Sequence, residues 1–509
     1  MGKSTNEGEI DKTKTKDTRI IMARKPFIRI NGFVPYNFVP NPISNQAIIV
    51  YFAVMATTAV LFSNLFMTWY WWLFGIVGVV GFFYFSNKLS KQWGNVRPKT
   101  FEHNLFWYTL LIRITVMLFL YWFHNKMTGQ PFMFHAADAI EYSYEAEWIA
   151  RCIRDGHFQD YWDYKFVQHN SVSDAGYPMY LGLVYLISGD SIIVARLLKC
   201  LWSALSCVLI YRLGKRNFGE HVGRIAAIIM MLEPHFSIYA GYHLKETEMI
   251  FMMLLFLERA DALLRYRNFS FKTVSIVVLL MAALFTFRTV LGLTAVFSMA
   301  MALLLSSQRV MGWGRRIVVL LVLLMSVLYF AGGRIMTEVE QIWQLRGQNQ
   351  DTRMSVIAET QSLAKYAGAA VFAPMIFTIP FPTMVETPKQ EIPRTLHGGM
   401  FVKNIMSYFT IMAILSLLIP IIPGFNKWRD HVLIGVFLIA YLVILVFSAF
   451  AHADRFHMPA LAIEVLFMAY GVSLCRIPQL QKWFKYWVVL MFFAVILWNW
   501  FKLAGRGMV

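Results

Sequence analysis

Long apolar runs constrain the fold of this chain more than any other feature. About thirteen runs near bilayer-spanning length follow one another along the sequence, and only a helix or a closed barrel satisfies all backbone polar groups inside a membrane. Apolar residues make up 58% of the chain and charged residues 15%, which excludes an ordinary soluble protein. The sequence therefore predicts an all-α polytopic membrane protein with about thirteen transmembrane helices. The expected spans cover residues 46–63, 69–86, 105–123, 194–213, 222–241, 247–264, 272–288, 290–306, 316–332, 402–423, 432–449, 458–474 and 484–502.

Basic residues gather in short loops between these runs and set the orientation. The loop after the second run carries Lys88, Lys91, Arg97 and Lys99, and the later short basic loops fall on the same side of the membrane as the N-terminus. The positive-inside rule places that side in the cytoplasm. The net charge of +18 thus reflects topology, and no nucleic-acid partner is expected. We predict an integral plasma (inner) membrane protein that contacts lipids and has its active site on the outer face.

The chain divides into five parts by this pattern. Residues 1–44 form a basic cytoplasmic tail without a cleaved signal peptide, and residues 45–104 form a two-helix segment. Residues 105–332 form a transmembrane core that includes a long outer loop, residues 124–193. Residues 333–400 form a second outer segment, which its prolines break into re-entrant or lid-like pieces, and residues 401–509 form the last helices. The four cysteines are scattered and indicate neither a disulfide framework nor a zinc site.

The first outer segment concentrates the carboxylates of this basic protein. Asp138 lies near the membrane boundary, with Glu141 and Tyr142 three and four residues further along an amphipathic helix predicted over residues 139–153. A carboxylate beside a low-dielectric region holds its proton more tightly, which suits a general base. Glu145, Glu147 and Asp155 are better explained as a solvated helix face.

Further polar groups lie in three later outer turns. His243, Lys245 and Glu246 stand where a helix re-enters the bilayer, which is costly unless they face a cavity or one another. Arg288 lies between two spans, and Arg455 and His457 share a late turn. Arginines from separate loops that face one cavity would bind a phosphate well. The alternatives are snorkelling cations and helix-start acids.

The carboxylates also raise the question of a metal. Asp138 and Glu246 together could orient an acceptor or hold a divalent cation, Mg²⁺ or Mn²⁺.

Several short motifs follow one another in a fixed order: D-A-I-E-Y at 138–142, A-x-x-I-A at 146–150, G-Y-P-M-Y at 176–180, A-R-L-L at 195–198, Y-R-L-G-K-R-N-F-G at 211–219, L-E-P at 232–234 and R-F-H-M-P-A at 455–460. This order resembles the GT-C glycosyltransferases, closest to the branch of protein O-mannosyltransferases and lipid A aminoarabinose transferases. The resemblance implies a GT-C-like fold and a polyprenyl-phosphate sugar as donor. It also implies that Asp138 serves the acceptor, that Glu246 is a second acid, and that Arg455 binds the donor phosphate.

Two features depart from that family. Residues 45–104 precede the family's usual first helix and are therefore an N-terminal addition. The family often has two adjacent acids in its first loop, whereas Ala139 follows Asp138 here and Glu141 is the next acid. Metal dependence is therefore open. A family member with a large C-terminal soluble domain is not expected.

We predict an inverting glycosyltransferase that moves a sugar from a polyprenyl-phosphate donor to a glycan, lipid or protein acceptor. Asp138, Glu246 and Glu141 are the catalytic candidates, and Lys245, Arg288 and Arg455 would hold the donor phosphate. His243, Tyr142, His457 and Tyr177 are supporting candidates.

Two other readings stay open. One is a flippase or transporter of lipid-linked intermediates, and the other is a polysaccharide polymerase or ligase that uses a pyrophosphate-linked donor. Transporters carry ionisable groups near the bilayer midplane on broken helices. Here the charges in the spans, among them Arg113, Glu258 and Glu464, are mostly expected near helix ends. That distribution favours an enzyme.

Overall fold

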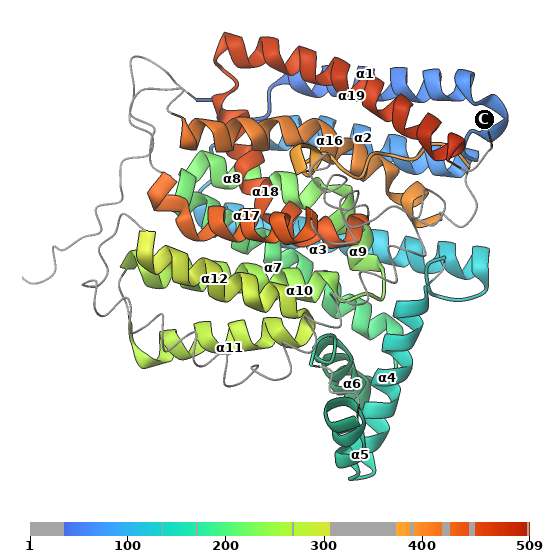
Figure 1. The fold of residues 1–509 in the computed structure, drawn as a ribbon, viewed down its shortest axis with the longest axis vertical. Coiled ribbons are helices and arrows are strands. Elements are labelled where there is room, and N and C mark those ends of the chain that lie inside the picture. Colours follow the sequence, from blue (N-terminus) through green and yellow to red (C-terminus); the bar gives the residue numbers. More distant parts are fainter. Residues whose placement is uncertain are drawn as a thin grey trace, which may run out of the picture. The chain divides into compact units, whose positions relative to one another are not determined.

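The computed structural model describes residues 35–134, 136–168, 172–266, 269–305, 373–386, 391–419, 428–446, 453–505 and 508. These residues form helices joined by short turns, and no β-strand is assigned among them. The helices are α1 (Asn41–Leu61), α2 (Trp69–Gln92), α3 (Pro98–Thr128), α4 (Ala137–Arg154), α5 (Phe158–Trp162), α6 (Gly176–Ser188), α7 (Ile192–Phe218), α8 (Glu220–Leu232), α9 (Pro234–Gly241), α10 (Glu246–Tyr266), α11 (Phe271–Phe287), α12 (Thr289–Leu305), α16 (Glu391–Leu418), α17 (Val432–Val446), α18 (Asp454–Leu474) and α19 (Pro478–Ala504), shown in Figure 1.

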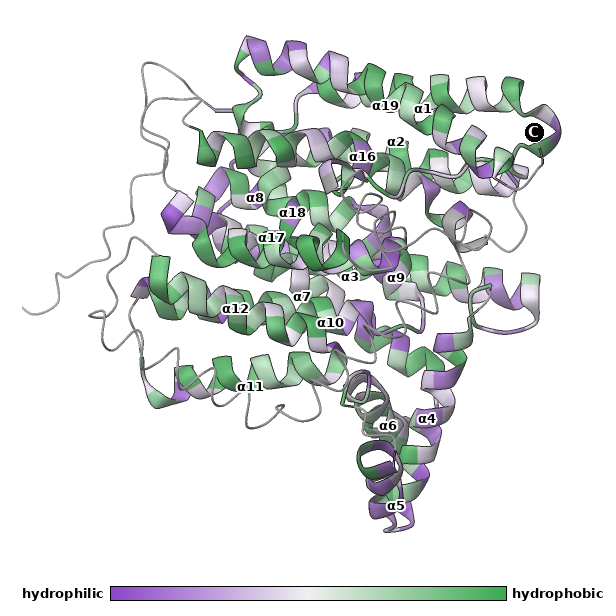
Figure 2. Cartoon of the chain, viewed as in Figure 1, coloured by the Kyte–Doolittle hydropathy of each residue, from purple (hydrophilic) through white to green (hydrophobic). Residues whose placement is uncertain are grey.

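Apolar helices of membrane-spanning length dominate this part of the chain. Eight candidate spans are long and apolar enough to cross a bilayer, and they include α1, α2, α3, α7, α16, α17, α18 and α19. The apolar helices α11 and α12 are shorter. Figure 2 shows hydrophobic residues along most of these helices. The prediction of an all-α polytopic membrane protein is confirmed, while the expected span 316–332 lies outside the described residues.

One expected span, residues 222–241, is a broken helix. Helix α8 ends at Leu232, and α9 begins at Pro234, whose ring cannot continue the preceding helix. The Glu233 carboxylate accepts hydrogen bonds from the backbone N–H groups of His235 and Phe236 and so caps α9. An uninterrupted apolar run therefore contains a discontinuity that hydropathy does not reveal.

Charged residues also lie deeper in the helices than the sequence indicated. Arg113 is fully buried in the middle of α3, where it donates hydrogen bonds to Ser203, Ser237 and the Met230 carbonyl. Glu464 is fully buried in the middle of α18, and Lys403 is buried inside α16. The expectation that span charges lie near helix ends is wrong for Arg113 and Glu464. Absence of interior charge is therefore not an argument against transport.

The two N-terminal helices pack against the last part of the chain. Helix α1 contacts α19, and α2 contacts α16 and α8. The α2–α16 contact is close because Gly75 and Gly398 let the two backbones approach. Beside them the Tyr51 hydroxyl and His397 Nε2 form a 2.9 Å hydrogen bond. Residues 45–104 thus share one packed core with the C-terminal helices.

Part of the second outer segment is buried without forming a long helix. Residues 373–386 hold a 3-10 turn, Ala373–Met375, followed by extended chain. Side chains satisfy the exposed backbone groups: Lys403, Asn404 and Ser407 of α16 donate to the carbonyls of Ile379, Thr378 and Phe377. Asn499 of α19 accepts from the Met384 N–H and donates to the Pro382 carbonyl. Non-helical backbone is tolerated among membrane helices only with such partners.

The first outer segment forms a helical hairpin. Helix α4 buries Ala139, Ala146 and Ile149, as the amphipathic pattern predicted, and it packs against α6. Gly182 of α6 permits this contact, because a Cβ there would lie 2.6 Å from the Ile149 side chain. In Figure 1, α4 runs across the direction of α10, α11 and α12. Asp138 lies in the first turn of α4.

Candidate functional site

The candidate site is built from helix ends. Asp138 lies in the first turn of α4, Lys245 and Glu246 lie at the start of α10, and Arg455 lies in the first turn of α18. Arg288 follows the last residue of α11, where the backbone is extended before α12 begins. Helix ends place charged side chains at the edge of the apolar core without opening the helices themselves. Four segments distant in sequence thus supply the site.

An ion pair links the first and last of these segments. Arg455 Nη1 donates to Asp138 Oδ2, although 317 residues separate them. Glu246 also interacts electrostatically with Arg455. It is buried, and its Oε2 atom has no hydrogen-bond partner. The site therefore holds one paired carboxylate and one whose hydrogen-bonding capacity is not used up.

Two arginines converge on a single ring. The guanidinium of Arg288 lies 4.5 Å from the centroid of Phe456, and that of Arg455 lies 4.9 Å from it. The ring stabilises both cations through its π face and holds them near each other. Arg288 Nη1 is buried and has no hydrogen-bond partner. Two planar donor groups at one place suit a phosphate or another oxyanion.

Tyr142 lies among these charges. It interacts electrostatically with Glu246, Asp138, Arg288 and Arg455. Burial, reinforced by Glu246 and Asp138, raises the pKa of Tyr142, so the hydroxyl stays protonated and able to donate. The Lys245 ammonium lies 5.8 Å from the centre of the same ring.

Lys245 is held at the site by a residue outside the predicted set. Its ammonium forms an ion pair with Asp174, which precedes α6 and has a left-handed backbone with φ of 66°. Burial, and then the nearby Arg288, lower the pKa of Lys245 well below its usual range. Sequence reasoning missed Asp174 as a site residue. Its position two residues before Gly176, at the start of the G-Y-P-M-Y motif, was the available signal.

Tyr177 and His243 form a layer behind Tyr142. The ring centroids of Tyr142 and Tyr177 are 5.2 Å apart, and those of Tyr177 and His243 are 6.4 Å apart. His243 Nε2 lies 3.3 Å from the Tyr185 hydroxyl. These two supporting candidates are thus buried beneath the charged groups and reach them through Tyr142.

Two predicted residues do not join the cluster. Glu141 is exposed on α4 and forms no ion pair with another residue that the structure describes. His457 is buried, and its Nδ1 lies 2.9 Å from the Lys403 ammonium inside the helical core. His457 follows Arg455 by only two residues, and helical geometry turns its side chain to another neighbour.

Metal-binding groups are sparse in the part of the chain that the structure describes. It contains no group of three or more His, Cys, Asp or Glu side chains placed to hold a metal ion. Asp138 is paired with Arg455, which leaves Glu246 as the free carboxylate of the predicted pair. A divalent cation at Asp138 and Glu246 stays a prediction.

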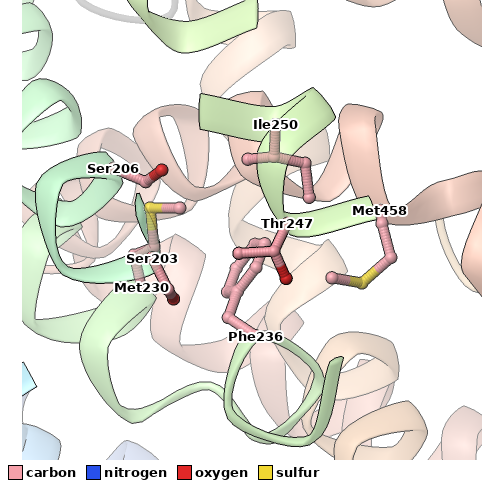
Figure 3. A pocket seen from close by; sticks show the side chains of 7 residues that line it. All are labelled: Ser203, Ser206, Met230, Phe236, Thr247, Ile250 and Met458. Atoms are coloured by element: carbon pink, nitrogen blue, oxygen red, sulfur yellow. The ribbon is translucent and has the colours of Figure 1, made fainter. Parts of the chain in front are cut away.

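A small cavity lies next to the site, between α7, α8, α9, α10 and α18. Figure 3 shows its lining side chains, Ser203, Ser206, Met230, Phe236, Thr247, Ile250 and Met458. Its volume of about 10 Å³ is room for roughly one water and far too small for a sugar. Thr247 follows Glu246 directly, so this cavity lies on the core side of that turn.

The arrangement as a whole can bind an oxyanion and accept a proton. Three cations, Lys245, Arg288 and Arg455, stand with two carboxylates, Asp138 and Glu246. Lys245 and Glu246 are buried, whereas the side chains of Asp138 and Arg455 are 42% and 33% exposed. Charge that develops on a leaving phosphate would be stabilised by donors that are already in place. A carboxylate within the same cluster can take a proton from a hydroxyl group.

Comparison with known proteins gives one match. Residues 176–332 match the model of the dolichyl-phosphate-mannose-protein mannosyltransferase family, and the described part of this region comprises α6 to α12. Neither the curated proteins nor the solved structures contain a match. The match confirms the resemblance to the GT-C superfamily that the motifs indicated. The helical fold and this match support a membrane glycosyltransferase of the GT-C type.

Proposed function

We propose that this protein transfers a sugar from a polyprenyl-phosphate donor to an acceptor at the outer face of the plasma membrane, with inversion at the anomeric carbon. The observation that carries the proposal is the convergence of three cations and two carboxylates from four distant segments. A lipid-linked donor presents a phosphate at the membrane surface, and the ends of α4, α10 and α18 hold groups that match it.

The donor phosphate would be bound by Arg288, Arg455 and Lys245. Arg288 has an unused buried N–H group, and the ring of Phe456 holds both arginines in place. In the structure Arg455 donates to Asp138, so an incoming phosphate competes with that carboxylate for the same cation. Binding of the donor would thus loosen Asp138 from its partner just when a base is needed.

The reaction itself then needs few groups. An acceptor hydroxyl attacks the anomeric carbon as Asp138 takes its proton, and the bond between that carbon and the phosphate oxygen breaks. The electron pair of that bond leaves with the polyprenyl phosphate, whose added charge the three cations neutralise without acid catalysis. Glu246 and the Tyr142 hydroxyl orient the acceptor or the sugar. Attack from the face opposite the phosphate inverts the configuration.

The acceptor is a glycan, a lipid or a protein. Most of the outer segment 333–400, which we expect to cover the donor lipid, lies outside the described residues. Apart from the first turns of α16, the described part of that segment is residues 373–386. Side chains of α16 and α19 hold these residues in place through hydrogen bonds to their backbone. A divalent cation between Asp138 and Glu246 belongs to the same proposal.

Transfer by the purified protein in lipid bilayers tests this function. Polyprenyl-phosphate and polyprenyl-pyrophosphate sugars are supplied in parallel, with and without a chelator, and the released lipid product is quantified. We expect consumption of the phosphate-linked donor. Comparison of the rates with and without chelator shows whether transfer requires a divalent cation. Use of the pyrophosphate donor alone would favour a polymerase or ligase. Movement of intact donor across the bilayer without release would favour a flippase.

A further inference from the structure

A second group of unsatisfied polar atoms lies behind Tyr177. It comprises His124 of α3, Tyr177 of α6, Arg196 of α7 and His243 of the turn before α10, and we call it the Arg196 chamber. All four side chains are at most 1% exposed. The atoms His124 Nδ1 and Nε2, Tyr177 Oη, Arg196 Nε and Nη1, and His243 Nδ1 have no hydrogen-bond partner. Buried polar atoms are nearly always paired, so atoms concentrated in this way have room for hydrogen bonds to ordered water or to a polar group of a ligand.

The charge of the chamber is not balanced by the protein. Arg196 Nη2 donates to the Pro131 carbonyl, and its guanidinium lies 5.6 Å from the ring centre of Tyr121. Among the described residues no carboxylate pairs with Arg196. The neighbouring cation Lys199 differs, because it forms a 2.8 Å ion pair with Glu248. A buried cation without a counter-anion is costly, and a bound anion removes that cost.

The two histidines do not supply a negative charge to balance Arg196, but they do supply hydrogen-bonding atoms. Burial, and then Arg196 and Lys199, lower the pKa of His243 well below its usual range, so its ring is neutral. Arg196 also interacts electrostatically with His124. A neutral imidazole has one donor and one acceptor nitrogen. The chamber therefore offers a fixed positive charge among neutral hydrogen-bonding groups, with the Lys199–Glu248 ion pair beside Tyr177 and His243.

The chamber lies next to the charged cluster yet is distinct from it. Tyr177 separates the two, because its ring contacts Tyr142 on one side and His243 on the other. Toward the outside the chamber is closed by residues 129–134, of which Pro131 and Phe132 are partly exposed. The Phe132 ring lies 5.9 Å from that of His243. A ligand can reach these atoms only if this short loop moves.

We propose that the Arg196 chamber binds an oxyanion, a carboxylate or phosphate group, that is carried by a substrate and is separate from the phosphate of the donor linkage. The carrier is the transferred sugar or the acceptor, an assignment that rests on the function proposed above. The enzyme thereby selects substrates with an additional negative charge.

Ligand protection tests the chamber without any need for turnover. Thermal unfolding of the purified full-length protein is followed with glucuronate, with glucose as the neutral control at equal ionic strength. We expect glucuronate, but not glucose, to raise the unfolding midpoint of the wild type and of Arg455→Gln. Arg196→Gln should lower the affinity for glucuronate, obtained from the concentration dependence of the midpoint, about 10- to 100-fold. That loss is the one expected for a charge-assisted hydrogen bond. Arg196→Lys should retain part of it, since the charge remains.

Two outcomes would overturn the proposal. One is a wild type that does not respond to glucuronate, and the other is an unchanged response in Arg196→Gln. The unfolding midpoint of each variant without ligand shows whether that variant is folded. If Arg196→Gln does not fold, the glucuronate response of Arg196→Lys is compared with that of the wild type instead.

Transfer kinetics then identify the carrier. Arg196→Gln raises KM for the donor if the sugar bears the anion, and KM for the acceptor if the acceptor does. Unchanged values for both would contradict the proposal, whereas absent turnover with intact glucuronate binding would contradict only the proposed transfer.

Discussion

At the scale of single residues, the site balances opposite charges before any substrate arrives. Asp138 and Arg455 neutralise each other, and Asp174 does the same for Lys245. Arg288 differs, because its Nη1 has no partner although it is buried. Paired charges keep an empty site stable, and an unpaired donor gives the first attachment point for an anion.

Loss of Arg288 should therefore weaken donor binding. Arg288→Gln removes the planar fork, and we expect KM for the lipid-linked donor to rise about 10- to 100-fold with a smaller change in KM for the acceptor. Arg288→Lys should restore little, because an ammonium lacks the fork geometry. Arg259→Gln, a half-exposed arginine on α10, is the matched control and should behave as wild type. Equal effects of the two Gln variants would remove Arg288 from the site.

The sequence anticipated most of the charged cluster for a physical reason. A charged residue at the end of an apolar run needs a partner or a cavity, so Glu246 and Arg288 were candidates by position, and Asp138 by position together with the motif resemblance. Asp174 could not be recognised, since its pairing with Lys245 depends on a left-handed turn. Nothing in the local pattern showed that His457 would face Lys403.

At the scale of helices, close packing explains why the N-terminal pair is attached so firmly. Helices α2 and α16 meet at glycines, where Gly398 approaches the backbone of Gly75. The Tyr51–His397 hydrogen bond spans the same contact. Such a contact cannot adjust to added atoms, because both sides are backbone or buried rings.

A methyl group at Gly75 should disrupt this contact. Its Cβ would lie 1.9 Å from His397 Nε2 and 2.1 Å from the Tyr51 hydroxyl, and we expect Gly75→Ala to destabilise the protein by about 1–3 kcal/mol. Gly81→Ala on the same helix meets nothing within 4 Å and should be neutral or slightly stabilising. Thermal unfolding in detergent compares the two. A lower midpoint for Gly81→Ala than for Gly75→Ala would contradict the packing described here.

The sequence predicted where the helices lie better than it predicted where a helix is broken. The limits of the apolar runs follow hydropathy, and α1, α2, α7 and α18 lie where the runs were found. The break at Glu233 was hidden because apolar residues continue on both sides of it. The path of residues 373–386 depends on Asn404 and Asn499, which lie on helices distant in sequence.

At the scale of the whole molecule, the helical core contains buried charged side chains, so a lack of charge in the spans does not distinguish an enzyme from a transporter. Arg113, Lys403 and Glu464 are buried inside helices, so this membrane protein has a polar interior as well as the charged cluster at its helix ends. What favours an enzyme is the family match together with the cluster at the helix ends. Sidedness is then the property on which the whole account depends.

Cysteine labelling tests that sidedness. All four native cysteines are buried, so an impermeant maleimide reports on introduced thiols. Asp155→Cys, exposed at the end of α4, should be labelled in intact cells. Lys272→Cys, exposed at the start of α11, should react only after permeabilisation, because the positive-inside rule places it in the cytoplasm. The reverse pattern would put the site on the wrong face.

The rate of sugar transfer by Asp138→Asn is the most direct test of the account. The variant keeps the size and hydrogen-bonding ability of the side chain but cannot take a proton, so we predict at least about a 100-fold loss of turnover. Asp155→Asn, an exposed acid on the same helix, should keep the wild-type rate with the same phosphate-linked donor. A folded Asp138→Asn protein that transfers sugar at close to the wild-type rate would contradict the proposed active site.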